Sequence, residues 1–343
     1  MTAPATNKLR VLILTDEGLV PDRPRTKLKG RQAEVRKTEY DVLGGLQRLG
    51  HDVYCVGAGS DLGVVSRAIA RRKPKIVFNL AEGRPELPFS DHHVVGYLEL
   101  RNQKYTGCNP RGLMVARDKA LTKMVLAYHR IRTPRFAVVA QRRKVSIPRR
   151  LRFPLFVKSL SAEGSEAISQ ASLVPDPDKL AERITFVHEK ADSTALVEEF
   201  IEGREIYVGV LGNELLTVLP AWELTMRKLT DGTPMIATDR AKWNPRYQKR
   251  IGLKSGPAAL PPRTATELER LSKRIYRLLG LSGYARLDYR LDGSGRFHLL
   301  EANPNPQIAR DEDFAEAAKH SGLAYEELLQ KLLTLGLGYR PRA

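Results

Sequence analysis

The sequence predicts an α/β protein whose second half is of the α+β type, and three features of the chain support this. Two short apolar runs, residues 9–14 (LRVLIL) and 75–80 (KIVFNL), are typical of buried strands. Between them, apolar residues recur with helical spacing over 38–49 and 62–71. Near the C-terminal end, the turn signal DGSG at 292–295 separates two strand-like runs and indicates a β-hairpin.

The first hundred residues follow the strand–helix–strand order of a parallel sheet. Residues 52–56 supply a strand between the two predicted helices, and Gly50 follows the first helix where a C-cap belongs. Short alternating units of this kind place parallel strands side by side. The turn after the first strand, residues 15–18, has no G-x-G-x-x-G pattern, so nothing supports a dinucleotide-binding domain.

The rest of the chain mixes helices with shorter strands. We expect an exposed basic connection over 144–152, a small-residue loop over 161–167 and a functional loop or lid over 225–262, which lacks strong periodicity. Further strands are predicted at 136–140, 153–158, 195–200, 205–211 and 214–219. Further helices are predicted at 92–100, 117–130, 178–190, 264–279 and within 312–335.

Length and composition exclude several classes of protein. The chain has 343 residues, of which 42% are hydrophobic and 28% charged, and this suits two or three globular domains. Two cysteines, Cys55 and Cys108, cannot build a disulfide scaffold or a four-thiolate zinc site. No apolar run approaches the ~20 residues that cross a bilayer, and no signal peptide is recognisable, so we expect a cytoplasmic protein.

The net charge is strongly positive, because 57 Lys and Arg outnumber 39 Asp and Glu to give a formal +18. A nucleic-acid partner is therefore one hypothesis, and it requires tight, steeply salt-dependent binding. The basic residues are dispersed, however, and no zinc-finger, basic-zipper or RNA-binding signature accompanies them. We expect solvated basic faces, with neither a specific nucleic acid nor a membrane as partner.

The chemistry concentrates in residues 283–303 (GYARLDYRLDGSGRFHLLEAN). Side chains alternate along a strand, so Arg286 and Asp288 share a face, as do Glu301 and Asn303. Folding the hairpin about its turn brings Asp288 within about one residue of Glu301. Two carboxylates and an amide at one point favour a hard cation such as Mg²⁺. From spacing alone, a polar face with an Arg–carboxylate pair explains the pattern equally well.

Two further stretches carry weaker signals. Lys158 ends a predicted strand before a Gly- and Ser-containing loop whose N–H groups suit phosphate oxygens, although an ordinary surface lysine explains it better. Lys119, which opens a predicted helix, is a weaker candidate still. The acids of residues 196–205 (LVEEFIEGRE) follow a buried strand. One interpretation is a hinge in which Glu205 binds hydroxyl groups. The other is that these acids form a solvated strand end.

Taken in order, these stretches resemble the ATP-grasp superfamily, and most closely the D-alanine–D-alanine ligase family. The resemblance runs from about residue 40 to 335. It is carried by KIVFNLAEG (75–83), VGYLELRNQKYTG (95–107), RDKALTKMVL (117–126), TPRFAVV (133–139), FPLFVKSLSAEGS (153–165), ALVEEFIEGREIYVGVLG (195–212) and GYARLDYRLDGSGRFHLLEANPNP (283–306). It implies an ATP-grasp fold with a pre-ATP-grasp α/β domain over 1–110, a central subdomain over 111–195 and a C-terminal subdomain over 196–343.

The resemblance also implies roles for individual residues, with ATP and Mg²⁺ (or Mn²⁺) as cofactors. The positions that match the family's phosphate-binding lysines and covering loop are Lys119, Lys158, Ser161, Gly164 and Ser165. Those that match the adenine hinge, its neighbour and the ribose-binding acid are Glu199, Phe200, Ile201, Glu198 and Glu205. The matching metal ligands are Asp288, Glu301 and Asn303, and the catalytic candidates are Arg286, for an oxyanion, and Lys242, for a phosphate on the lid.

The implied reaction is ATP-dependent ligation of a carboxylate to an amine through an acyl phosphate, with release of ADP and phosphate. The substrate positions depart from the family, since Glu82 replaces a histidine, and Gln307 and Arg310 stand where a Ser-Pro-Gly turn is usual. D-alanine, as used in peptidoglycan synthesis for the cell wall, is therefore only the family default. Another amino acid, a peptide or a metabolite is an alternative, as is a non-catalytic ATP-binding regulatory module. Homodimers are common in the family.

Overall fold

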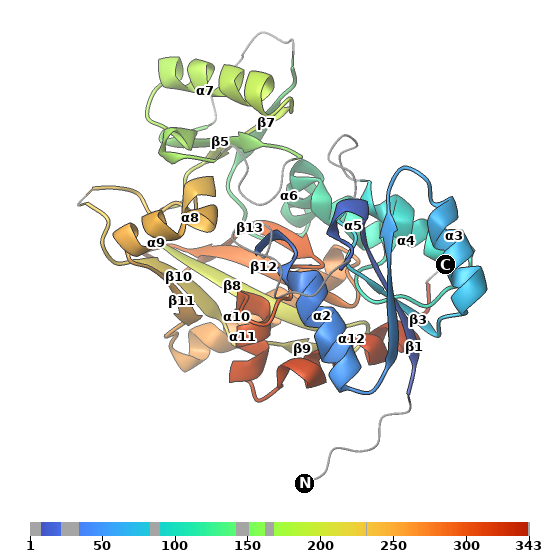
Figure 1. Cartoon of the computed structure of the whole chain (residues 1–343). Helices are drawn as coiled ribbons and strands as arrows, with labels where there is room; N and C mark the ends of the chain where they lie inside the picture. The colour runs from blue at the N-terminus through green and yellow to red at the C-terminus, as the bar shows by residue number, and fades with distance from the viewer. Residues whose placement is uncertain are drawn as a thin grey trace.

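The computed structural model describes residues 8–21, 34–82, 90–141, 151–161, 168–230 and 232–341. The strands of these residues form one parallel and two antiparallel sheets, with helices packed against them (Figure 1). This arrangement confirms the predicted α/β class with an α+β second half. Within the ranges given, no helix is long and apolar enough to cross a membrane.

The N-terminal domain is built on a parallel sheet in the order β2-β1-β3, as the strand–helix–strand pattern predicts. Its elements are β1 (Arg10–Asp16), the 3-10 helix η1 (Glu17–Leu19), α2 (Lys37–Arg48), β2 (Asp52–Ala58), α3 (Gly63–Arg72), β3 (Ile76–Asn79) and α4 (Asp91–Leu100). Side chains of β1 alternate between two cores: Leu12 packs with Val65 of α3, and Val11 packs with Val42 of α2. Gly50 follows α2 with φ of +82°, a conformation that glycine adopts without strain.

The central subdomain has an antiparallel sheet in the order β4-β7-β5-β6. Two helices, α5 (Pro110–Arg117) and α6 (Lys119–Tyr128), lead into it. Its elements are β4 (Phe136–Val139), β5 (Leu155–Ser159), the 3-10 helix η3 (Gln170–Ser172), β6 (Leu173–Val174), α7 (Pro177–Lys190) and β7 (Ala195–Glu199). α7 packs Leu180 and Ile184 against Leu155 and Val157 of β5, which gives this subdomain a core of its own.

The C-terminal subdomain has a sheet in the order β11-β10-β8-β12-β13, and β9 pairs with β8. Its elements are β8 (Arg204–Gly212), β9 (Leu216–Val218), β10 (Trp222–Met226), α8 (Asp239–Trp243), α9 (Pro245–Ile251), β11 (Leu253–Pro257), α10 (Pro262–Leu278), β12 (Tyr284–Leu291), β13 (Phe297–Pro304), α11 (Asp313–His320) and α12 (Tyr325–Gly338). Alternate residues of β8 face opposite sides: Val208 joins the core that contains Ile275 of α10, and Tyr207 joins the core that contains Phe314 of α11. The predicted β12–β13 hairpin is confirmed.

Both large cores extend across the N-terminal domain and the C-terminal sheet. Leu12 and Leu287 belong to one of them, and Val11 and Leu211 belong to the other. The division at 110/111 and 195/196 stays a prediction, but the first and third of the predicted domains share their hydrophobic interior. The strands β4 to β7, by contrast, stand apart with α7 at the top of Figure 1.

Two segments differ from the sequence prediction. The helix expected over 117–130 is confirmed as α6, but the helix α5 before it was not predicted, and the two are separated by Asp118. Its carboxylate accepts hydrogen bonds of 2.9 Å from the N–H groups of Ala120 and Leu121 and caps the second helix. The segment 225–262, expected to be a loop, contains β11, α8 and α9. These elements of five to seven residues are too short to show a periodic signal.

Candidate active site

The β12–β13 hairpin brings the predicted polar residues to one place. Across the two strands Asp288 lies opposite Glu301, and Arg286 lies opposite Asn303. Arg286 donates from Nε and Nη2 to the two oxygens of Asp288, at 2.8 and 2.9 Å, and the Asn303 amide donates to Asp288 Oδ2 at 2.9 Å. The guanidinium of Arg286 also lies 4.8 Å from the ring centroid of Tyr207. The two interpretations left open by the spacing are both present, an Arg–carboxylate pair and a converging set of oxygen ligands.

The two carboxylates have opposite electrostatic environments. Burial raises the pKa of Asp288; Arg286 opposes this shift and the charge of Glu301 adds to it. Burial also acts to raise the pKa of Glu301, but the charges of Lys119 and Lys158 outweigh it and hold that pKa at about 2. Glu301 is therefore ionised at neutral pH. Its side chain is 28% exposed, which leaves its oxygens accessible to a ligand.

A buried ion cluster faces the hairpin from the central subdomain. Glu198 on β7 lies 2.7 Å from Lys123 Nζ and 3.1 Å from Lys158 Nζ. Burial acts to raise the Glu198 pKa, but the two lysines lower it. Burial lowers the pKa of Lys123, whereas the pKa of Lys158 is raised because its carboxylate neighbours outweigh burial. Two lysines on one carboxylate leave a positive charge with which an anion would interact favourably.

Lys123 is a site residue that sequence reasoning missed. Its Nζ donates to the Leu300 carbonyl at 3.2 Å, where a bulge after Asp288 takes Leu300 out of the strand pairing. The signal was present in the chain, since Lys119 and Lys123 are four residues apart and therefore lie on the same face of α6. Lys119 Nζ lies 3.8 Å from Glu301 and 3.4 Å from the Leu160 carbonyl.

The lid candidate Lys242 also lies near the hairpin. It belongs to α8, which is capped by the Thr238 side chain. The charge of Lys242 lowers the pKa of both Asp288 and Glu301, so it acts on the same carboxylates as Lys119 and Lys158. The four predicted cationic side chains therefore lie around Asp288 and Glu301, two of the three predicted metal ligands. The functional roles of these residues stay predictions.

The predicted hinge follows β7 directly. The N–H of Glu199 donates to the Arg135 carbonyl and that of Phe200 to the Pro154 carbonyl, at 2.9 and 3.1 Å. In the part of the chain that the structure describes, the Ile201 N–H makes no backbone hydrogen bond. Adenine recognition at this hinge would thus rest on Ile201 and on carbonyl groups rather than on the first two N–H groups.

The predicted ribose acid is buried in a polar network. Glu205 is 7% exposed, accepts a hydrogen bond from Tyr207 at 2.7 Å and lies 2.9 Å from Arg290 Nη2. Arg290 in turn donates to the carbonyls of Gly203 and Met235, both at 2.8 Å. Glu205 is held rigidly beside the hinge, with its oxygens already engaged.

The predicted phosphate loop is described only at its start. Ser161 donates its N–H to Ser159 Oγ at 3.2 Å, and its hydroxyl lies 3.0 Å from that of Ser193. Gly164 and Ser165 lie outside the described residues.

The predicted substrate residues occupy different positions. Glu82 is exposed after β3, and Gln307 is half-buried after β13. Arg310 points to α12, where its guanidinium lies 2.6 Å from Glu326 and 4.3 Å from the Tyr325 ring centroid. Among the described residues, these three side chains form no hydrogen bond or ion pair with one another, and their role stays a prediction.

An acidic group near Glu82 was also missed. Glu39, near the start of α2, is 4% exposed, and its Oε2 has no hydrogen-bond partner among the residues that the structure describes. Burial raises the pKa of Glu39 to about 7, and the charges of Glu82 and Asp16 add to the effect. The N–H of Glu82 donates to Asp16 Oδ2 at 3.4 Å. These carboxylates gather at the carboxyl ends of β1 and β3, the edge at which open α/β sheets bind ligands.

A divalent cation has a suitable donor set on the hairpin. Asp288, Glu301 and Asn303 offer the hard oxygen ligands that Mg²⁺ prefers. Burial, with the charge of Glu301 adding to it, raises the pKa of Asp288, and a bound cation would oppose that shift. Among the described residues, no group of three or more His, Cys, Asp or Glu side chains is arranged to hold a metal. The set is thus small, as is usual for Mg²⁺ that also binds phosphates and water.

Comparisons with known proteins identify the family of this chain. A family model described as D-ala D-ala ligase C-terminus matches residues 120–334. A D-alanine–D-alanine ligase of Bordetella petrii is 32% identical over 247 residues, 71% of each chain. An uncharacterized protein of Sinorhizobium fredii, y4sG, is 32% identical over 320 residues, 91% of this chain and 89% of that protein.

A solved structure shows the same fold. The D-alanine–D-alanine ligase from Bacillus anthracis, complexed with ATP, has a TM-score of 0.74 and 19% identity, and the match covers 96% of this chain and 97% of that one. The family model spans well over half of the chain, and the Bordetella petrii relative exceeds 30% identity over most of its length. The chain therefore belongs to the D-alanine–D-alanine ligase family, whose members are ATP-dependent carbon–nitrogen ligases with the ATP-grasp fold.

Proposed function

We propose that this protein joins a carboxylate to an amine through an acyl phosphate, at the expense of ATP. The observation that carries the proposal is the pairing of Asp288 with Glu301 across the hairpin, beside cations from two other elements. Phosphoryl transfer depends mainly on positioning and on charge stabilisation, and this arrangement supplies both. The ATP-bound relative from Bacillus anthracis supports the choice of nucleotide.

The proposed reaction has two steps. A substrate carboxylate oxygen attacks the γ-phosphorus, the bond to ADP breaks, and an acyl phosphate forms. The amine nitrogen then attacks the acyl carbon, so that a C–N bond forms, phosphate leaves with the electrons of the C–O bond, and the nitrogen releases a proton. Lys119 and Lys158 would bind the phosphates, and Arg286 would stabilise the oxyanion of the second step.

The metal requirement follows from the same residues. Mg²⁺ held by Asp288, Glu301 and Asn303 would neutralise charge on the phosphate oxygens. Arg286 holds both oxygens of Asp288, so Asp288 would be shared between the guanidinium and the cation. This sharing would place Arg286 beside the reacting phosphate while keeping its orientation.

The substrate class is an amine-bearing carboxylic acid. The carboxylates of Asp16, Glu39 and Glu82 gather in one region and favour a cationic ammonium group there. D-alanine is the substrate that the names of the relatives imply, and with it the protein would act in cytoplasmic synthesis of cell-wall precursors. Because Glu82 and Gln307 depart from the family pattern, another amino acid or a peptide is the second candidate.

Phosphate release from ATP and Mg²⁺ across single and paired D- and L-amino acids tests the proposal. We expect release that depends on an amino acid, with the ligated product identified by mass spectrometry. Glu301→Gln should lower turnover at least about a hundredfold because it removes a metal ligand. Glu269→Gln is the matched control, since Glu269 is exposed on α10 and, within the described residues, its one ion pair is with Lys273 four residues away.

Undiminished turnover in Glu301→Gln would contradict the metal assignment. ATP binding without turnover on any substrate would favour the regulatory module over the ligase. Turnover with D-alanine alone would establish the family default, whereas turnover only with another acid and amine would make the altered positions specificity determinants.

A further inference from the structure

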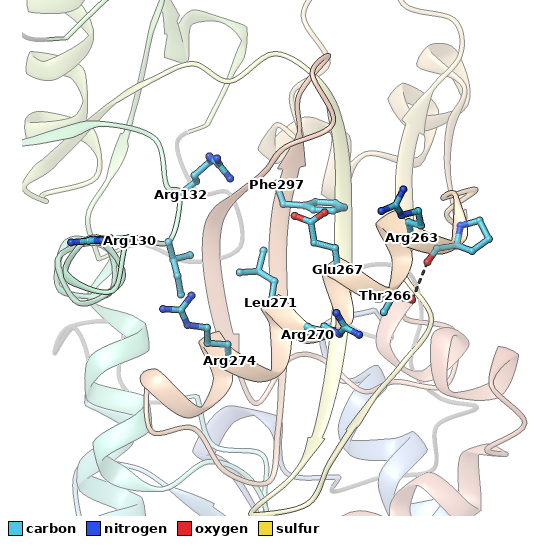
Figure 2. Close-up of a pocket in the computed structure, with 11 residues that line it drawn as sticks. Arg130, Arg132, Arg263, Thr266, Glu267, Arg270, Leu271, Arg274 and Phe297 are labelled. Carbon is cyan, nitrogen blue, oxygen red and sulfur yellow. Dashed lines mark hydrogen bonds between the residues drawn. The ribbon is translucent and has the colours of Figure 1, made fainter.

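A second concave site lies away from the residues discussed above. A cavity of about 760 Å³ separates α10 from the segment that follows α6 (Figure 2). Five arginines line it, and we call them the arginine groove: Arg130, Arg132, Arg263, Arg270 and Arg274. Ile131, Leu271 and the buried ring of Phe297 provide its apolar part.

One wall of the groove is the solvent-facing side of α10. Its lining residues recur every three or four positions, from Arg263 through Glu267 and Arg270 to Arg274. The opposite side of the helix carries Leu268 and Ile275, which are buried. At 1.5 Å per residue, Arg263 and Arg274 are about 16 Å apart along the helix axis, so the groove presents an extended row of positive charge.

The other wall is held by backbone contacts. The carbonyl of Arg132 accepts a hydrogen bond of 3.0 Å from the N–H of Leu299 on β13. Arg130 follows the C-cap of α6 with φ of +58°, a conformation in which glycine is usual. Figure 2 shows Arg130 and Arg132 on one side and Arg263, Arg270 and Arg274 of α10 on the other.

The groove has a large excess of positive charge. Glu267 is the one carboxylate among its described lining residues. Arg274 donates to the His129 carbonyl at 2.9 Å, and in the described part of the chain none of the other four arginines forms an ion pair. Arg204, Arg286 and Arg290, by contrast, each contact a carboxylate within 3 Å. Like charges along one groove repel one another, and an anion bound between them would reduce that repulsion.

The start of α10 adds to the positive potential. The helix begins beside the groove at Pro262, has no acidic residue in its first turn and has no side-chain cap. Pro261 and Pro262 have no N–H to offer, so the positive end of the helix dipole is the feature that favours an anion on the same side as Arg263.

We propose that the arginine groove binds a compact ligand that carries several phosphate groups. Guanidinium groups bind phosphate through paired hydrogen bonds, and five of them match a ligand with more than one phosphate. The cavity volume falls in the range of small-molecule sites. A single-stranded nucleic acid is disfavoured, because such ligands stack on exposed aromatic rings and Phe297 is only 3% exposed.

Titration of the full-length protein with inorganic tripolyphosphate, followed by calorimetry, tests this proposal. Arg270→Gln should weaken binding about threefold to tenfold, and the combined change of Arg263, Arg270 and Arg274 to Gln should weaken it further. Arg277→Gln is the matched control, because it removes the same charge from the exposed surface of the same helix without lining the cavity. It should change the affinity less than about twofold. Tripolyphosphate also binds the lysines of the ATP site, but these lysines are unchanged in every variant. Their contribution to the measured affinity therefore cancels when the variants are compared.

Equal losses in Arg270→Gln and Arg277→Gln would overturn the proposal, since they would show a response to net charge alone. Tighter binding of a single-stranded oligonucleotide than of tripolyphosphate, through the same arginines, would overturn it in favour of nucleic acid. Thermal unfolding of each variant separates lost binding from lost folding. Arg130→Gly provides a second route, because it removes a groove charge at a backbone position that suits glycine.

Discussion

Glu39 places a buried carboxylate at the strand ends of the N-terminal domain, and its ionisation lowers the free energy of unfolding. Burial and two neighbouring acids raise its pKa from an ordinary value of 4.5 to about 7. The folded protein therefore holds the Glu39 proton more tightly than the unfolded protein does. The free energy of unfolding consequently falls as the pH rises from about 4.5 through 7. Costly titratable groups of this kind concentrate at functional sites.

Glu39→Gln should therefore stabilise the protein above neutral pH. At about 1.4 kcal/mol per pKa unit, the gain in unfolding free energy at pH 8 has an upper limit of about 3 kcal/mol. At pH 4 the carboxyl is protonated in both states, so the gain should vanish. Urea unfolding of both proteins at the two pH values measures this. An equal effect at pH 4 and pH 8 would show that packing, and not ionisation, distinguishes Glu and Gln at this position.

At the scale of elements, Asp118 sets both the start of a helix and the position of a site lysine. Asp118→Ala removes the cap of α6, and we expect a loss of about 1 kcal/mol in unfolding free energy. Because Lys119 is the first residue of α6, the KM for ATP should rise as well. Asp118→Asn keeps an accepting oxygen and should retain most of the stability and the KM. Thermal unfolding and ATP titration of the two variants measure these effects, and equal behaviour of Ala and Asn would contradict a capping role.

Local patterns predicted the elements that depend on neighbours in the chain. The turn at 292–295 and the alternation of side chains were enough to bring Asp288 within about one residue of Glu301, and the bulge after Asp288 sets their final pairing. The start of α6 at Lys119 was predicted, but the helix α5 before it was missed, because its eight residues give only a brief periodic signal. The bulge at Leu300 and the cluster around Glu198 were not predictable, since they depend on contacts between segments far apart in the sequence.

The whole molecule consists of two hydrophobic units that meet at the active site. The N-terminal domain and the C-terminal sheet share their cores, whereas the central sheet and α7 have a smaller core of their own. Lys123 links the two units: it belongs to α6, which packs on β13, and it pairs with Glu198 of the central sheet. The family resemblance implied three domains, and that division stays a prediction, because a sequence pattern records where elements begin and end but not which faces pack together.

The division into two hydrophobic units predicts which sheet opens locally most often. Amides of β5 and β7 should exchange with solvent faster than those of β1, β8 and β12, because their smaller core gives less protection against local opening. ATP held between Lys158 and the hairpin would bind both units at once, so it should slow exchange in the central sheet more than in the shared cores. Hydrogen exchange followed by mass spectrometry, with and without a non-hydrolysable ATP analogue, measures both effects. Uniform protection without nucleotide would mean that the three sheets unfold as one unit, and the central sheet would then not be a separately moving part of the enzyme.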